Sequence, residues 1–122
     1  MIALNLTIER KWLDMIASGE KREEYRDCEN RQCVRLYNDT GHDGCRMPDN
    51  LVAVFRNGYR MDSRALAVRL AGMGLRSGRE AQHPEWGEPT GRRLHFVLKL
   101  GEVLMIAPYH DIRESLKEGG AK

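Results

Sequence analysis

The sequence predicts an α+β protein, mainly β, with one good helix near its start. Two observations carry this prediction. Apolar and polar residues alternate over the first eight positions, and the period then changes to helical spacing just before Gly19. The later apolar segments are short and separated by turn-forming residues, as in strands. A length of 122 residues suits one domain with a single core, so we expect one domain over residues 1–122.

The first strand and the helix are the most clearly marked elements. The strand is expected to bury the face formed by Ile2, Leu4, Leu6 and Ile8. The helix should cover residues 9 to 18, because apolar residues recur three and four positions apart at Trp12, Leu13, Ile16 and Ala17. Gly19 should end it, since a residue without Cβ readily adopts the left-handed conformation that closes a last turn.

The run Gly19-Glu20-Lys21-Arg22-Glu23-Glu24-Tyr25-Arg26 is the segment most suited to chemistry. A strand reaching about Arg26 would place Lys21 and Glu24 on opposite faces. They converge only if Lys21 lies in the turn before the strand, or if a bulge re-aims one side chain. The alternative is an edge strand kept soluble by alternating charge.

The remaining elements are predicted from turn signals. Residues 28–50 should hold a short helix or turn around Val34, Leu36 and Tyr37, followed by a loop. A strand over 51–56, the turn former Asn57-Gly58 and a partner strand over about 65–71 form a hairpin. Residues 72–91 are too rich in Gly, Arg and Pro for a long regular element. A last strand or hairpin covers 94–106 with a bend at Gly101. The tail from 111 to 122 is expected either to be flexible or to form a short helix that frays at Gly119-Gly120.

Five blocks of the chain together resemble the ASCH domain, a branch of the PUA-like β-barrels. The run at Gly19, Lys21, Glu24 and Arg26 matches its Gly-x-Lys-x-x-Glu-x-Arg signature. The other matching blocks, which span nearly the whole chain in the order of small phage and bacterial members, are Lys11-Trp12-Leu13-Asp14-Met15-Ile16, Phe55-Arg56-Asn57-Gly58-Tyr59, Pro84-Glu85-Trp86-Gly87 and Phe96-Val97-Leu98-Lys99-Leu100-Gly101-Glu102. The resemblance implies a single PUA-like barrel with one N-terminal amphipathic helix and short extra helices.

The resemblance implies two kinds of activity. PUA-like domains are widely associated with RNA binding in the cleft beside the signature. Some small bacterial members are amidohydrolases that deacetylate N4-acetylcytidine with a lysine, a threonine and a glutamate, and others cleave RNA. The lysine corresponds to Lys21, the threonine position is Glu24, and the glutamate corresponds to Glu85 or alternatively to Glu80.

Glu24 in place of a hydroxyl changes what the signature can do. A neighbouring carboxylate stabilises the lysine as an ammonium, which disfavours its use as a base. The pair could instead bind a nucleobase, with Lys21 donating to a ring carbonyl, Glu24 accepting from an amine, and Arg26 holding Glu24. Glu24 could otherwise activate a water. If Glu24 and Arg26 only brace the barrel, mutating either should affect stability alone.

Basic and aromatic residues in the middle of the chain favour an RNA partner. Residues 51–100 contain nine basic and four acidic residues, and eight of the nine are arginines. Arginine offers bidentate phosphate contacts and stacks on bases. The candidate ligand-binding residues are Tyr25, Arg26, Arg56, Asn57, Tyr59, Arg60 and Trp86. The alternative is a set of solvated arginines with no shared face, with Tyr59 closing the barrel and Trp86 filling the core.

Catalytic candidates are Lys21, Glu24 and Glu85, the last because a carboxylate beside an aromatic wall can serve as an acid or base. We expect no cofactor and no metal. An alternative is structural zinc on Cys28, Cys33, His42 and Cys45, whose residue types suit zinc but whose spacing matches no common finger. An odd cysteine count, and the lack of a signal peptide or apolar run of membrane-spanning length, indicate a cytoplasmic protein without a membrane partner. A monomer is favoured.

Three functions follow in order of preference. The first is binding of RNA or a modified nucleoside in a charged cleft beside the signature. The second is a small amidohydrolase acting on N4-acylated cytidine, or an RNA-cleaving enzyme of the same family. The third is a protein-interaction module. Binding through phosphates should weaken as salt rises, whereas turnover of a neutral nucleoside should not.

Overall fold

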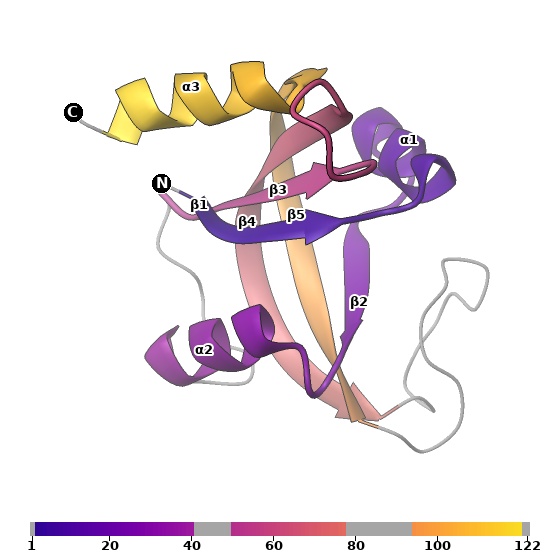
Figure 1. The fold of residues 1–122 in the computed structure, drawn as a ribbon. Coiled ribbons are helices and arrows are strands. Elements are labelled where there is room, and N and C mark those ends of the chain that lie inside the picture. The colour runs from indigo at the N-terminus through magenta and orange to yellow at the C-terminus, as the bar shows by residue number, and fades with distance from the viewer. Residues whose placement is uncertain (1, 41–49, 78–93, 121–122) are drawn as a thin grey trace.

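The computed structural model describes residues 2–40, 50–77 and 94–120. Within them the chain forms an α+β fold dominated by strands (Figure 1). In chain order the elements are β1 (Ile2–Thr7), α1 (Arg10–Ser18), β2 (Glu23–Asp27), α2 (Arg31–Thr40), β3 (Val52–Arg56), β4 (Arg64–Ser77), β5 (Leu94–Pro108) and α3 (Tyr109–Gly120).

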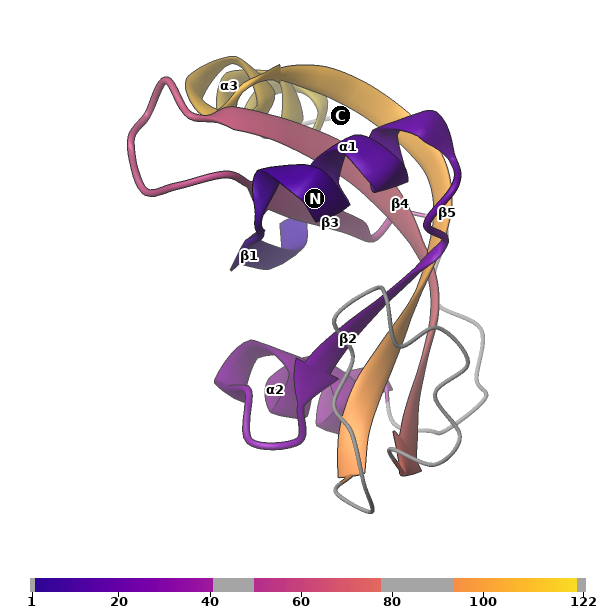
Figure 2. The same ribbon diagram turned by 90° about the vertical axis from the view of Figure 1, so that its right-hand side faces the viewer.

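The described strands form one sheet in the order β1-β3-β4-β5-β2. The β1–β3 pair is parallel, and the β3–β4, β4–β5 and β5–β2 pairs are antiparallel. Register shifts between β4 and β5 occur after Ala67, Val68 and Leu70, and such bulges increase local bending and twist. The sheet accordingly curls into a half-barrel (Figure 2), with β1 and β2 as its two edges.

Helix α1 confirms the clearest prediction. Gly19 follows it in the left-handed conformation, with φ of 85°, and its N–H donates to the carbonyl of Ile16. Leu13 and Ile16 are the buried residues of the helix, as the spacing indicates. Because Gly19 ends the helix at a defined residue, it fixes where the following turn begins.

Two apolar clusters lie on the two faces of the sheet. The larger one joins β1, α1, α2 and the facing sides of β3, β4 and β5, and its fully buried members include Leu4, Leu13 and Phe55. The smaller one packs α3 against β3 and β4 through Tyr109 and Ile112. The segment that starts at 111 is therefore anchored, since Ile112 is completely buried.

Several boundaries differ from the predictions. Strand β4 continues to Ser77, so the glycines at 72 and 74 do not interrupt it. Their positions oppose Lys99 and Val97 of β5, and the long ladder supplies the backbone hydrogen bonds that offset their low strand preference. Strand β5 is continuous across Gly101, which confirms the strand rather than the hairpin alternative, and it extends to Pro108.

The short helices also differ in length from expectation. Helix α2 is a full ten-residue helix that buries Cys33 and Leu36. Helix α3 begins at Tyr109 and includes Gly119 and Gly120, which were expected to fray. The connection over residues 57–63 is as expected, and Gly58 has a φ of 121°. None of the helices that the structure describes has the length and apolarity needed to cross a membrane.

Candidate ligand-binding site

The signature residues converge because Lys21 lies in the turn before β2. The first of the two predicted arrangements is therefore the observed one. The backbone N–H of Lys21 donates to the carbonyl of Met15, which ties the turn to α1. From this position the Lys21 ammonium reaches Glu24, with 2.9 Å between Nζ and Oε1.

Glu24 also binds Arg26, and Arg26 continues the chain of contacts to the opposite edge of the sheet. One terminal nitrogen of Arg26 lies 2.7 Å from Glu24 Oε2 and donates to the Thr7 carbonyl at 2.8 Å. We call Lys21, Glu24 and Arg26 the ion relay. Since Thr7 ends β1, the relay links the two edge strands of the half-barrel.

The ion relay is largely withdrawn from solvent. The exposed fractions of the side chains are 0% for Lys21, 7% for Glu24 and 20% for Arg26. The Lys21 ammonium lies 5.4 Å from the centroid of the Trp12 ring and 5.2 Å from that of Tyr25, within cation–π range. Arg26 is thus the member of the relay that a ligand reaches first.

One donor of the relay has no acceptor among the residues that the structure describes. Arg26 Nε is buried and makes no hydrogen bond within the described structure. Leaving a buried donor unpaired costs about 1–3 kcal/mol. A ligand that brings an acceptor oxygen to this nitrogen would remove that cost.

Helix α2 closes the site from another side through Cys33. Burial raises the pKa of the Cys33 thiol to about 12, the Arg26 guanidinium acts to lower it, and the Glu24 carboxylate acts to raise it. The charges of both Arg26 and Glu24 therefore act on the Cys33 thiol. Its thiol is fully buried in the main apolar cluster.

The predicted RNA-binding loop divides into anchored and exposed residues. The Arg56 guanidinium stacks 3.6 Å from the centre of the Tyr109 ring and donates to the Arg60 carbonyl at 2.8 Å. Asn57 Nδ2 donates to the Ile8 carbonyl at 2.9 Å. Arg56 and Asn57 therefore make contacts within the fold, as suits the predicted turn former Asn57-Gly58, and their part in ligand binding stays a prediction.

Tyr59 and Arg60, by contrast, face solvent. Tyr59 is 86% exposed, so it does not close the barrel. Arg60 is 83% exposed and pairs with Asp62 at 3.1 Å. The loop thus presents the Tyr59 ring and the Arg60 guanidinium to solvent, while Arg56 and Asn57 hold the start of the loop in place.

Tyr25 and His95 form a second buried pair that the sequence did not indicate. The Tyr25 hydroxyl donates to Glu23 Oε1 at 2.8 Å, and its ring meets that of His95 edge-on with centroids 5.6 Å apart. His95 of β5 is fully buried, and neither of its ring nitrogens has a hydrogen-bond partner among the described residues. A single histidine between apolar strand residues carries no spacing signal that could have revealed this.

Some candidate residues lie outside the described part of the chain. These are Glu80, Glu85 and Trp86, together with His42 and Cys45 of the possible zinc set. Of that set, Cys28 is half-buried and Cys33 is a buried thiol with a raised pKa, which disfavours the thiolate that zinc requires. The described residues contain no group of three metal-ligating side chains.

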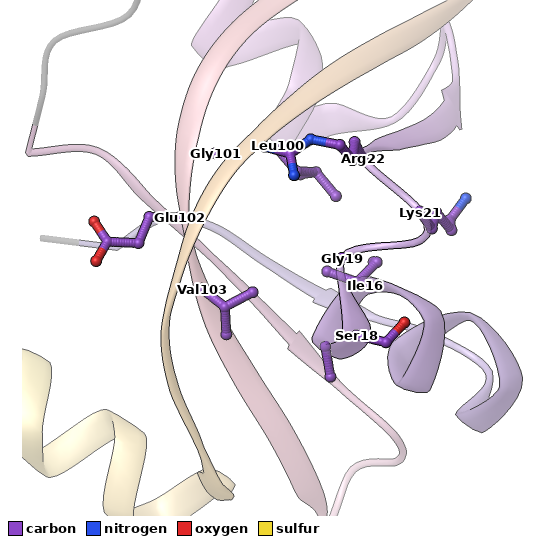
Figure 3. A pocket seen from close by; sticks show the side chains of 10 residues that line it. Ile16, Ser18, Gly19, Lys21, Arg22, Leu100, Gly101, Glu102 and Val103 are labelled. Atoms are coloured by element: carbon purple, nitrogen blue, oxygen red, sulfur yellow. The ribbon is translucent and has the colours of Figure 1, made fainter.

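A pocket of about 180 Å³ lies beside the turn between α1 and β2. Its walls are residues 16–19, 21 and 22 of that turn and residues 100–103 of β5. Figure 3 shows that the Lys21 side chain points away from Glu102 and Val103. Lys21 therefore belongs both to the wall of the pocket and to the ion relay, through its ion pair with Glu24.

Comparison of the chain with protein-family models, with curated proteins and with solved structures gives no match. The candidate site is therefore defined by the contacts of its own residues.

Proposed function

We propose that this protein binds RNA or a modified nucleoside, as an ASCH-type member of the PUA-like barrels, at the Glu24–Arg26 end of the ion relay. The observation that carries the proposal is the buried Arg26 Nε, which has no acceptor in the described part of the chain and lies next to a carboxylate that accepts hydrogen bonds. The curled sheet with α1 beside its signature turn is consistent with such a barrel.

A nucleobase matches this arrangement chemically. Its ring carbonyl supplies the acceptor that Arg26 Nε lacks, and an exocyclic amine supplies a donor to Glu24. Trp12, half-buried beside the Lys21 ammonium, offers an aromatic face. Lys21 holds Glu24 in place, because its ion pair fixes the carboxylate oxygen that the ligand does not use.

The exposed loop extends the proposed surface. Arg26 donates to the carbonyl of Thr7 and Asn57 to the carbonyl of the next residue, Ile8, so both contact the same β1–α1 connection. A strand of RNA that places one base at Arg26 could stack another on Tyr59. Arg60 would then contact a phosphate.

Binding is preferred to hydrolysis because Lys21 is used as a cation in the ion pair with Glu24. The amidohydrolase alternative has a direct test. Purified protein and Lys21→Ala would be incubated with N4-acetylcytidine, and deacetylation would be followed by mass spectrometry. If the wild type deacetylates N4-acetylcytidine and Lys21→Ala does not, hydrolysis becomes the favoured function.

The binding proposal is tested by anisotropy titrations of a fluorescent single-stranded RNA at several salt concentrations, with nucleosides as competitors. Arg26→Lys keeps the charge and removes Nε, so it should weaken competition by a nucleoside about tenfold. Tyr59→Ala should weaken RNA binding by about tenfold, since a stacked base contributes about 1–3 kcal/mol.

Val34→Ala is the matched control, because this residue of α2 is exposed and is not among the proposed contact residues. It should leave both affinities unchanged. Thermal melts of each variant separate loss of binding from loss of fold. Wild-type protein that binds neither RNA nor nucleoside, or equal affinities for all folded variants, would refute the proposal.

A further inference from the structure

The second half of β5 is an open strand edge. Strand β2 pairs with β5 only along residues 95–99. Residues 101–108 pair with β4 on one side and, within the described structure, have no strand on the other. Figure 2 shows this part of β5 running along the margin of the sheet beyond β2.

This edge is apolar as well as open. Its sequence is Gly-Glu-Val-Leu-Met-Ile-Ala-Pro, with a single charge, and every residue from 101 to 108 is at least partly exposed. Leu104 is 39% and Ile106 45% exposed. Natural proteins normally protect a long apolar edge with charges, prolines or a covering element, because it otherwise pairs with another strand.

We propose that residues 101–108 of β5 pair antiparallel with the same residues of a second copy of this chain, forming a two-fold dimer with a continuous sheet. This goes beyond the monomer expected from the sequence and is independent of the proposed ligand site. An isologous dimer needs only one self-complementary surface, which a strand edge provides.

The charge pattern favours one register for the pair. With Met105 on the two-fold axis, Leu104 of one copy lies opposite Ile106 of the other, so the two exposed apolar side chains cover each other twice. Glu102 then lies opposite Pro108, and the two carboxylates are at opposite ends of the paired segment. A register centred nearer Glu102 would bring these like charges together, which is destabilising.

Residues beside the paired strands should add to the dimer interface. A standard dimer interface uses about 20–30 residues on each side, more than one strand provides. In the antiparallel pair, the Pro108 end of one copy meets the Gly101 end of the other, where α1 and the following turn form the 180 Å³ pocket. The pocket rim therefore supplies further contact surface at both ends of the pair.

The test is the mass in solution, measured by light scattering after gel filtration across about a hundredfold range of concentration. The wild type should move from 14.0 kDa toward twice that mass as concentration rises. Ile106→Lys should raise the dimer dissociation constant about tenfold or more, because it places two charges in the pair. Val34→Lys, which adds the same charge at another exposed apolar residue, should dimerise like the wild type.

A second measurement on the unmodified protein keeps the test independent of the variants' folding. Amide hydrogen exchange in residues 101–108 should slow as the wild type is concentrated, while exchange in α2 stays constant. A wild type that remains at 14.0 kDa throughout, or a dimer that Ile106→Lys leaves intact, would overturn the proposal.

Discussion

At the scale of residues, the main feature is a buried carboxylate held between two cations. Glu24 lies 2.9 Å from the Lys21 ammonium and 2.7 Å from the Arg26 guanidinium. Each charge is tolerated out of water because its partner is in direct contact. Removing the negative charge should therefore cost more than removing an exposed ion pair.

We predict that Glu24→Gln lowers the free energy of unfolding by about 3–5 kcal/mol, because it leaves two like charges buried together. The measurement is urea denaturation followed by circular dichroism. Asp62→Asn, which removes the exposed pair with Arg60, is the control and should cost less than about 1 kcal/mol. Similar losses of unfolding free energy in the two variants would show that burial does not determine how much the ion relay contributes to stability.

Cys33 should make stability fall at alkaline pH. The thiol pKa rises from 9.0 to about 12 on folding, so the folded state keeps a proton that the unfolded state releases. Its contribution is fully present below pH 9 and is lost as pH rises toward 12. The loss should be on the order of 1 kcal/mol per pH unit in this window.

Urea denaturation from pH 8 to 10.5 checks this prediction. Cys33→Ala lacks the titrating group and should lose less stability over the same range, although it is less stable at pH 8 because of the cavity. Parallel curves for wild type and variant would contradict the assignment.

At the scale of elements, α1 and β2 are joined by a turn whose geometry depends on one backbone conformation. Gly19 has a φ of 85°, and no neighbouring atom lies within 4 Å of the position that a Cβ would occupy. A side chain at this position would strain the backbone, but it would not clash with neighbouring atoms. The turn it starts sets the position of Lys21.

We predict that Gly19→Ala destabilises the protein by about 1 kcal/mol through this strain alone. Gly72→Ala is the matched control, because Gly72 has no positive φ and its added Cβ would make only ordinary contacts of 3.7 Å or more with Lys99. Thermal denaturation of both variants gives the comparison. Equal melting temperatures would argue against a strained turn.

At the scale of the whole molecule, side chains rather than strand pairing close the gap between β1 and β2. Gln32 of α2 binds both backbone groups of Asn5, accepting from its N–H and donating to its carbonyl at 2.9 Å. Arg26 binds the Thr7 carbonyl further along the same strand. The β1 edge is thus protected within the molecule, whereas the open part of β5 has no comparable protection among the described residues.

Gln32→Ala should expose the β1 edge without unfolding the sheet. We expect the Asn5 amide to exchange at least about tenfold faster, since its hydrogen-bond acceptor is lost. Amides of β3 and β4 in the centre of the sheet should not change. Val34→Ala on the same helix is the control, and faster exchange in both variants would indicate a general loosening of α2.

The candidate site was predictable only in part. The spacing of Lys21, Glu24 and Arg26 marked them as a group, and Gly19 indicated where the turn begins. The distinction between anchored Arg56 and exposed Tyr59 was not predictable, because both lie in one polar segment and differ only in whether Tyr109 packs beside them. The buried His95 was missed for the same reason, since its surroundings come from distant strands.

The sequence by itself determined the local elements: the alternating first strand, the helix that stops at Gly19 and the strands around residues 57–63. These depend on contacts between residues close in the chain, so periodicity and turn residues are sufficient to predict them. The tertiary structure alone decided that Arg26 reaches the Thr7 carbonyl, that the charges of Arg26 and Glu24 act on Cys33 and that half of β5 is left open. Those features depend on how a curled sheet brings distant edges together, and local residue patterns do not encode that closure.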